Sequence, residues 1–271
     1  MTSTTDEQKE PSMTTRDATV TGTPCWADLW TSDVEGSRRF YSELFGWEAL
    51  DPDPAFGGYF NFARQGVWTA GCMGDMGDMK ATDTWKPYLA TDNMVKTIEA
   101  AEAAGAQVAV PDMPVGDLGV QGVLTDPTGA TIGVWQAGTW PGGSVVEEHG
   151  APSWFELHTG DYAGALTFYR DVFGFEATTV SDSDEFRYST LRRPGGEVDL
   201  AGICDDTSLV PNHETAHWAI YWEVDDVDAG VATVETLGGT VYAGANSTPY
   251  GRIAVVADPS GAKFMLRTRP A

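Results

Sequence analysis

The sequence has few basic residues and no long apolar run. Lysine and arginine together number 16, against 40 aspartates and glutamates, and the formal net charge is −24. So acidic a surface repels nucleic-acid phosphates and anionic lipid, so we expect neither nucleic acid nor a membrane as a partner. No apolar stretch approaches the ~20 residues of a membrane span, and the first residues lack the apolar core of a signal peptide.

Cysteine is also scarce. The three cysteines, Cys25, Cys72 and Cys204, are an odd number and none belongs to a Cys-x-x-Cys pair, so they do not form a disulfide framework. Sparse thiols are typical of a reducing compartment, and the sequence therefore predicts a cytoplasmic protein. Residues 1–20 are polar with almost nothing to bury, and we expect them to form a flexible N-terminal arm.

An internal duplication organises the rest of the 271 residues. The segment WADLWTSDVEGSRRFYSELFGWE, which begins at Trp26, aligns without a gap with WFELHTGDYAGALTFYRDVFGFE, which begins at Trp154. The sequence DPTGA at Asp126 recurs as DPSGA at Asp258. The repeat predicts two related domains, residues 21–140 and 152–271, joined by a linker over 141–151 that contains Gly and Pro.

Each half has the same order of expected elements. An alternating strand comes first, and a helix follows between Asp33 as N-cap and Gly46 as its closing residue, with Asp161 and Gly174 as their counterparts. Three strands complete the unit, and the unit occurs twice in each half. We therefore predict an α+β fold in which two βαβββ modules per domain form a cupped, mostly antiparallel sheet with helices on one face.

These motifs resemble those of a known family. The pattern Asp-x-x-x-(Ser/Ala)-x-x-Phe-Tyr-x-x-(Leu/Val)-Phe-Gly-(Trp/Phe), followed some 80 residues later by Asp-Pro-x-Gly-Ala, is similar to that of the vicinal oxygen chelate superfamily. That group includes glyoxalases, extradiol dioxygenases and the bleomycin and fosfomycin resistance proteins. The resemblance covers nearly all of the chain beyond the arm, and the tandem form resembles actinobacterial glyoxalase-like proteins. It implies that each sheet curls into a cup that holds a small organic molecule.

The resemblance also implies where metal ligands would stand, and this sequence does not retain them. The six positions hold Trp26, Lys86, Gly133, Trp154, Ala219 and Met265. None is a good ligand, since an indole offers only an N–H donor. We therefore predict no metal or other cofactor. A displaced divalent-metal site at Glu156, His158, His217 and Glu223 has suitable ligand types, but no spacing motif supports it.

The side chains on the cup face can be read in steps of two along each strand. The first domain offers Trp26, Asp28, Trp30, Lys86 and Tyr88, and the second offers Trp154, Glu156, His158, His217, Tyr221 and Glu223. Aromatic walls with a few polar groups are typical of a site for a flat organic ligand. For the large aromatic residues, packing in the core is an equally good explanation.

Two functions compete. In the first, the protein is an enzyme, a metal-independent lyase, cyclase or isomerase that acts on an aromatic or polyketide-like molecule of secondary metabolism. Glu156 or His158 would then move the proton, and Tyr221 or His217 would hold the oxygen. The predicted substrate-binding residues are Trp26, Asp28, Trp30, Tyr88, Trp154 and Glu223.

In the second, the protein binds and sequesters a drug or metabolite without turnover, as in the bleomycin-resistance branch. A ligand-free structural role would leave the polar residues of the cup unexplained. The second domain has more proton-transfer groups than the first, which favours an enzyme. Either way we expect a small organic ligand and a monomer or homodimer.

Overall fold

The structure is a computed structural model that describes residues 17–143, 145–206 and 216–270. Each half of the chain folds into one eight-stranded sheet, with the strand order β2-β3-β4-β1-β5-β8-β7-β6 in the first half and β10-β11-β12-β9-β13-β16-β15-β14 in the second. The two orders are the same when the strands are numbered from the start of each half. The predicted α+β fold of four βαβββ modules is therefore confirmed.

Apart from one short 3-10 helix in the first half, the described elements follow one another in the same order in both halves. In the first half they are β1 (Pro24–Trp30), α1 (Val34–Phe45), β2 (Glu48–Ala49), the 3-10 helix η1 (Pro54–Phe56), β3 (Phe60–Arg64), β4 (Val67–Met73), β5 (Thr84–Thr91), α2 (Met94–Ala103), β6 (Gln107–Val115), β7 (Gly119–Thr125) and β8 (Thr131–Ala137). In the second they are β9 (Pro152–Thr159), α3 (Tyr162–Phe173), β10 (Glu176–Asp182), β11 (Arg187–Arg192), β12 (Asp199–Asp205), β13 (His217–Glu223), α4 (Val227–Thr236), β14 (Thr240–Thr248), β15 (Gly251–Ala257) and β16 (Lys263–Thr268).

The first helix of each half begins and ends at the expected residues. The side chain of Asp33 accepts a hydrogen bond from the Gly36 amide, and Gly46 takes the left-handed conformation at φ 68° that ends α1. Asp161 and Gly174 do the same for α3. Glycine suits this closing position because it has no Cβ to clash with the helix backbone.

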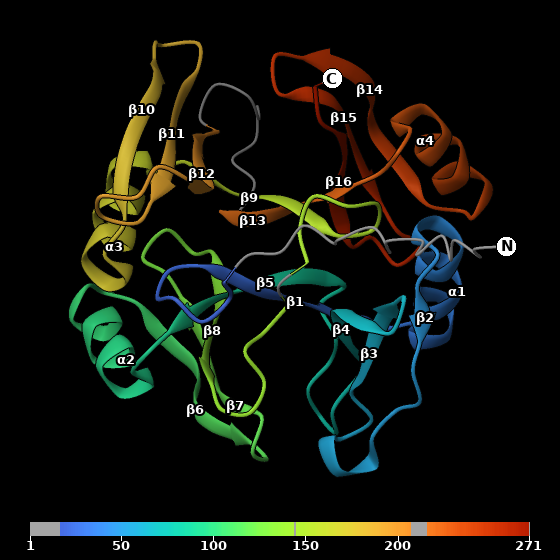
Figure 1. The fold of residues 1–271 in the computed structure, drawn as a ribbon, viewed down its shortest axis with the longest axis horizontal. Helices are drawn as coiled ribbons and strands as arrows, with labels where there is room; N and C mark the ends of the chain where they lie inside the picture. Colours follow the sequence, from blue (N-terminus) through green and yellow to red (C-terminus); the bar gives the residue numbers. More distant parts are fainter. Residues whose placement is uncertain (1–16, 144, 207–215, 271) are drawn as a thin grey trace, which may run out of the picture.

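Two modules join edge to edge in each sheet. In the first half, β1 pairs antiparallel with β5, and the parallel pairs β1–β4 and β5–β8 close the modules on either side. Figure 1 shows that each sheet curls into an arch, with the convex sides of the two arches facing each other and the helices on the outer flanks. We call the concave face of the first sheet the first cup, and that of the second sheet the second cup.

One continuous core lies between the sheets. It contains large side chains from both halves, among them Leu29, Phe40, Tyr41, Trp47, Phe62, Trp85, Phe155, Phe168, Tyr169, Trp218, Trp222 and Phe264. Helix α1 packs beside α4 and α2 beside α3, so each helix contacts the other half (Figure 1). None of the helices among the described residues is long and apolar enough to cross a membrane.

Packing in the first half starts before β1. Residues 1–16 of the expected arm lie outside the described residues, but Ala18 is buried in a cluster with Trp26, and the Gly22 amide donates to the Ala90 carbonyl at 2.9 Å. Residues 17–23 therefore pack against the first sheet.

A reciprocal pair of hydrogen bonds joins the two halves. The hydroxyl of Tyr41 in α1 donates to Oδ2 of Asp258, in the turn before β16, at 3.0 Å. The hydroxyl of Tyr169 in α3 donates to Oδ2 of Asp126, in the turn before β8, at 2.8 Å. All four residues belong to the repeated Phe-Tyr and Asp-Pro-x-Gly motifs. The Phe-Tyr motif of each half thus contacts the Asp-Pro-x-Gly motif of the other half.

The two aspartates also close their own turns. Oδ1 of Asp126 accepts from the amides of Thr128 and Ala130, and Oδ1 of Asp258 accepts from the amides of residues 260–262. Burial, and then the neighbouring Asp258, raise the pKa of Tyr41 well above its ordinary value, so its hydroxyl keeps the proton that it donates. A buried donor and acceptor therefore depend on each other across the domain interface.

Replacing either tyrosine should destabilise the whole chain. The indole of Trp85 donates to the Tyr41 hydroxyl, and that of Trp218 donates to the Tyr169 hydroxyl. We expect Tyr41→Phe and Tyr169→Phe each to lower the free energy of unfolding by about 1–3 kcal/mol, because each leaves a buried carboxylate oxygen and one of these indole N–H groups unpaired. Urea denaturation followed by circular dichroism measures this loss. Tyr250→Phe, at a tyrosine that is 51% exposed, is the control. A loss no larger than that of the control would contradict the assigned role.

Candidate functional site

Glu156 lies at the centre of the second cup, on β9. Its carboxylate is buried, and Oε1 accepts a hydrogen bond from the Tyr221 hydroxyl at 2.9 Å. The Trp154 indole donates to Oε2 at 3.3 Å and to the Tyr188 hydroxyl at 3.0 Å. The Tyr188 hydroxyl also hydrogen-bonds to the Glu156 carboxylate, so Tyr221, Trp154 and Tyr188 hold this carboxylate together.

The strand register brings these groups together. Trp154, Glu156 and His158 on β9 stand opposite Tyr221, Ala219 and His217 on β13. On the other side Glu156 is opposite Gly202 of β12. A Cβ at Gly202 would overlap the Tyr188 hydroxyl, so glycine leaves room for that tyrosine beside the carboxylate. Small neighbours on both strands thus make space around Glu156.

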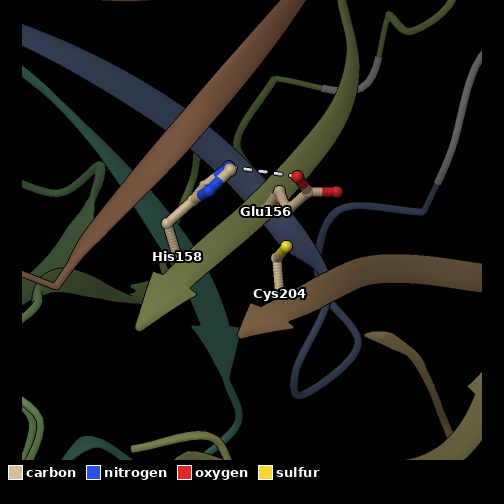
Figure 2. Close-up of side chains that lie close together, drawn as sticks. All are labelled: Glu156, His158 and Cys204. Atoms are coloured by element: carbon tan, nitrogen blue, oxygen red, sulfur yellow. Dashed lines mark ion pairs between the residues drawn. The ribbon is translucent and has the colours of Figure 1, made fainter. Parts of the chain in front are cut away.

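His158 lies between two carboxylates. Its Nδ1 is 3.0 Å from Oδ1 of Asp206, and its Nε2 is 3.0 Å from Oε1 of Glu156. The Nε2–H direction is not aligned for a hydrogen bond to Glu156, so this contact is a close ion pair. The imidazole also stacks on His217, with ring centroids 5.2 Å apart and planes 7° from parallel. Figure 2 shows His158 turned toward Glu156 on the same strand.

The ion pair fixes the charges at neutral pH. Burial alone would lower the pKa of His158, but the carboxylates of Asp206 and Glu156 raise it to about 10. Burial alone would raise the pKa of Glu156, but His158 and the hydroxyls of Tyr188 and Tyr221 hold it below its ordinary value. The site therefore contains an imidazolium next to a carboxylate.

Asp28 is the counterpart of Glu156 in the first cup. Its Oδ1 accepts from the Trp26 indole at 2.9 Å and from the Tyr59 hydroxyl at 2.8 Å, and its Oδ2 accepts from the Tyr88 hydroxyl at 2.7 Å. Trp26 and Tyr59 also contact each other at 2.9 Å. Three donors thus engage a carboxylate that has no histidine beside it, because Trp30 stands where the second half has His158.

Two predicted site residues lie at the ends of their strands. The Trp30 indole donates to the Gly74 carbonyl at 2.9 Å. Glu223, expected to face Glu156, is instead held by Arg269, whose amide donates to Oε1 at 3.1 Å. In the register of β13, Glu223 stands four residues beyond Ala219, the partner of Glu156. The Arg269 guanidinium also pairs with Glu147 of the linker at 2.6 Å. Arg269 therefore joins Glu223 at the end of β13 to the linker.

The structure adds site residues that sequence reasoning missed. Tyr59, just before β3, and Tyr188, on β11, reach the two carboxylates across the intervening strands β4 and β12. Asp206 supports His158, and Gln121 contacts the Tyr88 hydroxyl at 3.2 Å. Each tyrosine lies near the start of the second strand after the first helix of its half. The loops before these strands differ in length, so the two tyrosines do not occupy equivalent positions of the sequence repeat. Their shared signal is an aromatic residue near the start of the strand, which is too common to single out.

One group of described residues has donor atoms close enough to hold a metal ion. These atoms, from Glu156, His158 and Cys204, lie within 4.8 Å of one another (Figure 2). In the structure these groups are engaged otherwise: both ring nitrogens of His158 face carboxylates, and burial raises the pKa of the Cys204 thiol far above its ordinary value. Because a metal ligand must be deprotonated, an ion could bind here only by displacing the protons of this pair and of the thiol.

The ligand positions of the resembling family do not fit a metal. In the second half they hold Trp154, whose indole N–H is used as a donor, together with Ala219 and Met265. In the first half the position in β8 is Gly133, and the ring of Tyr88 fills the space that a side chain there would need. Both cups thus replace ligand atoms with aromatic rings.

Comparison with known proteins agrees with this architecture. Residues 151–266 match the family model described as Glyoxalase/Bleomycin resistance protein/Dioxygenase superfamily, and residues 26–135 match a Glyoxalase-like domain. CFP32 of Mycobacterium tuberculosis (strain CDC 1551 / Oshkosh), which carries a provisional glyoxylase name, is 35% identical over 90% of this chain and 94% of its own. The chain belongs to the glyoxalase/bleomycin resistance/dioxygenase superfamily.

Other members of this superfamily align over most of the chain. The anthracycline biosynthesis protein DauV of Streptomyces sp. (strain C5) is 34% identical over 90% of this chain and 92% of its own. The Mn(II)-bound glyoxalase of Novosphingobium aromaticivorans has a TM-score of 0.63 at 18% identity, covering 92% of this chain and 82% of its own. A likeness at that identity shows the shared fold and leaves the chemistry to the site itself.

The charge on His158 can be tested directly. We expect the imidazole of His158 to stay protonated through neutral pH and to titrate near pH 10, as followed by NMR and assigned with His158→Gln. Because the folded pKa lies above the unfolded value of about 6.5, the ion pair should stabilise the fold fully below that pH. This contribution is lost as pH rises toward 10. Titration below pH 7.5 would refute the ion pair.

The donor set also leads to an expectation about metal content. We expect the purified protein to contain much less than one equivalent of zinc, iron or manganese by elemental analysis, because the donors in the second cup are protonated or paired. One equivalent of metal that is lost in both Glu156→Ala and His158→Ala would overturn this expectation.

Proposed function

We propose that the second cup catalyses a metal-independent acid–base reaction, a cyclisation, dehydration or isomerisation, on a small aromatic or polyketide-like molecule. The observation that carries the proposal is the buried ion pair of His158 and Glu156 on a concave face lined by Trp154, Tyr188 and Tyr221. The name of DauV, an anthracycline biosynthesis protein, supports a polycyclic aromatic substrate.

The pair has the charges that enolisation requires. Glu156 removes a proton from the carbon next to a substrate carbonyl, and His158 gives its Nε2 proton to the carbonyl oxygen. The carboxylate becomes a neutral acid, the imidazolium becomes a neutral imidazole and the substrate becomes an enol. Because burial penalises charged groups, a step that neutralises both is favoured in this site.

The enol can then react by three routes, and in each the enol hydroxyl returns its proton to Nε2 of His158 as the carbonyl re-forms. Transfer of the Glu156 proton to another carbon gives isomerisation, and its transfer to a departing β-hydroxyl, which leaves as water, gives dehydration. Attack of the enol carbon on a second carbonyl, whose oxygen takes the proton from Glu156, closes a ring. In each route Tyr221 holds Glu156 in place, and Asp206 fixes the His158 ring through Nδ1.

Binding without turnover is the competing function. The observation that favours it is that a carboxylate among aromatic residues occurs in both cups, as expected for two similar binding sites. Catalysis would need the imidazolium, which lies only in the second cup. The absence of turnover in the experiment below would decide for binding.

The experiment begins with a thermal-shift screen of aromatic and polyketide metabolites, because a ligand that binds the native state raises its melting temperature. Steady-state kinetics on a compound that is converted should show kcat at least about tenfold lower in Glu156→Gln and His158→Gln, because a general acid or base contributes about 10²–10⁴-fold to the rate. Asp28→Asn, at the counterpart position of the first half, should keep kcat within about threefold of wild type.

Folding of each variant is checked by circular dichroism. Unchanged kcat in both second-cup variants would refute the acid–base roles, and a loss confined to Asp28→Asn would move the reaction to the first cup.

A further inference from the structure

The first cup contains an ammonium group that has no polar partner among the described residues. Lys86 on β5 stands opposite Asp28 of β1, and its Nζ lies 5.1 Å from the centre of the Tyr88 ring. Among the residues that the structure describes, it makes no hydrogen bond or ion pair. Burial lowers the pKa of Lys86, while Asp28 raises it in part. A partly buried cation that only faces a ring needs an explanation.

Asp28 does not neutralise Lys86 by contact. Its carboxylate already accepts hydrogen bonds from Trp26, Tyr59 and Tyr88. These donors hold Asp28 in the sheet, and within the described residues no hydrogen bond or ion pair joins its carboxylate to Lys86. Lys86 is therefore the donor of the first cup that is left for another molecule.

The surroundings of Lys86 are flat and aromatic. Tyr88 is its neighbour on the same face of β5, and Trp30 follows Asp28 on the same face of β1. Trp140, just before the linker, packs edge-on against Trp26 with ring centroids 4.7 Å apart. Trp140 thus adds to the aromatic lining around Trp26.

We propose that the first cup binds a planar aromatic molecule with an anionic oxygen, a carboxylate or phenolate, and that Lys86 holds this oxygen. The aromatic side chains contact the ring system, and the ammonium supplies the charge and the hydrogen-bond donor. The second cup has Ala219 at the position of Lys86 and an imidazolium paired to Glu156. This binding site is therefore separate from the proposed reaction and does not depend on it.

The probe for this site is 2-naphthoate, with the uncharged 2-naphthalenemethanol for comparison. Isothermal titration calorimetry on the full chain should show one equivalent of 2-naphthoate bound to the wild type. Lys86→Met should weaken this binding at least about tenfold, as expected when a charge-assisted hydrogen bond is lost. Lys86→Arg should retain affinity within a few fold, and Lys96→Met, at an exposed lysine of α2, should leave it unchanged.

The uncharged probe separates charge recognition from ring burial. It should bind the wild type more weakly than 2-naphthoate does, with the same affinity in Lys86→Met. The variant should also melt at a temperature no lower than the wild type, because it removes a partly buried charge that makes no hydrogen bond or ion pair within the described residues. A lower melting temperature would show that Lys86 serves the fold.

Three further results would overturn the proposal. The first is no measurable binding of 2-naphthoate to the wild type at millimolar concentration. The second is equal affinity in wild type and Lys86→Met. The third is affinity lost in Glu156→Gln but kept in Lys86→Met, which would place the aromatic anion in the second cup.

Discussion

The exchange of hydrogen bonds between the halves is the constraint on which both cups depend. Tyr41 reaches Asp258, and Tyr169 reaches Asp126, each inside the common core. Because these aspartates also close the turns before β16 and β8, the interface fixes the strands that form one side of each cup. Neither sheet can shift against the other without leaving a buried polar group unpaired.

On this shared frame the two cups have diverged through a few positions. Trp30 corresponds to His158, and Lys86 corresponds to Ala219, while the aromatic residue and carboxylate at the start of β1 and β9 remain. The first carboxylate is engaged by three donors, and the second is paired with an imidazolium. Similar backbones thus hold a carboxylate in two different electrostatic states.

The fold could be predicted almost completely because its signals are local and occur twice. Asp33, Gly46 and their counterparts mark the helix ends, and the period of two separates the core face from the cup face. The gap-free repeat shows that Glu156 is the counterpart of Asp28 before any contact is known.

The contacts of the site were harder to predict because they join distant segments. Alternation correctly placed Tyr221 and His158 beside Glu156, yet it could not show that Arg269 would take Glu223. Tyr59, Tyr188 and Asp206 lie at loop ends, where register depends on loop length rather than on the pattern of the strand. The protonation of His158 also depends on Asp206, which is 48 residues away in the sequence.

The reciprocal Tyr–Asp contact has the geometry of an isologous dimer interface, in which each partner gives the same donor and receives at the same acceptor. In a homodimer of two identical halves, every substitution would occur in both cups. Covalent fusion of the two halves removes that restriction. One cup can acquire an imidazolium while the other acquires an ammonium, and the interface that holds them stays the same.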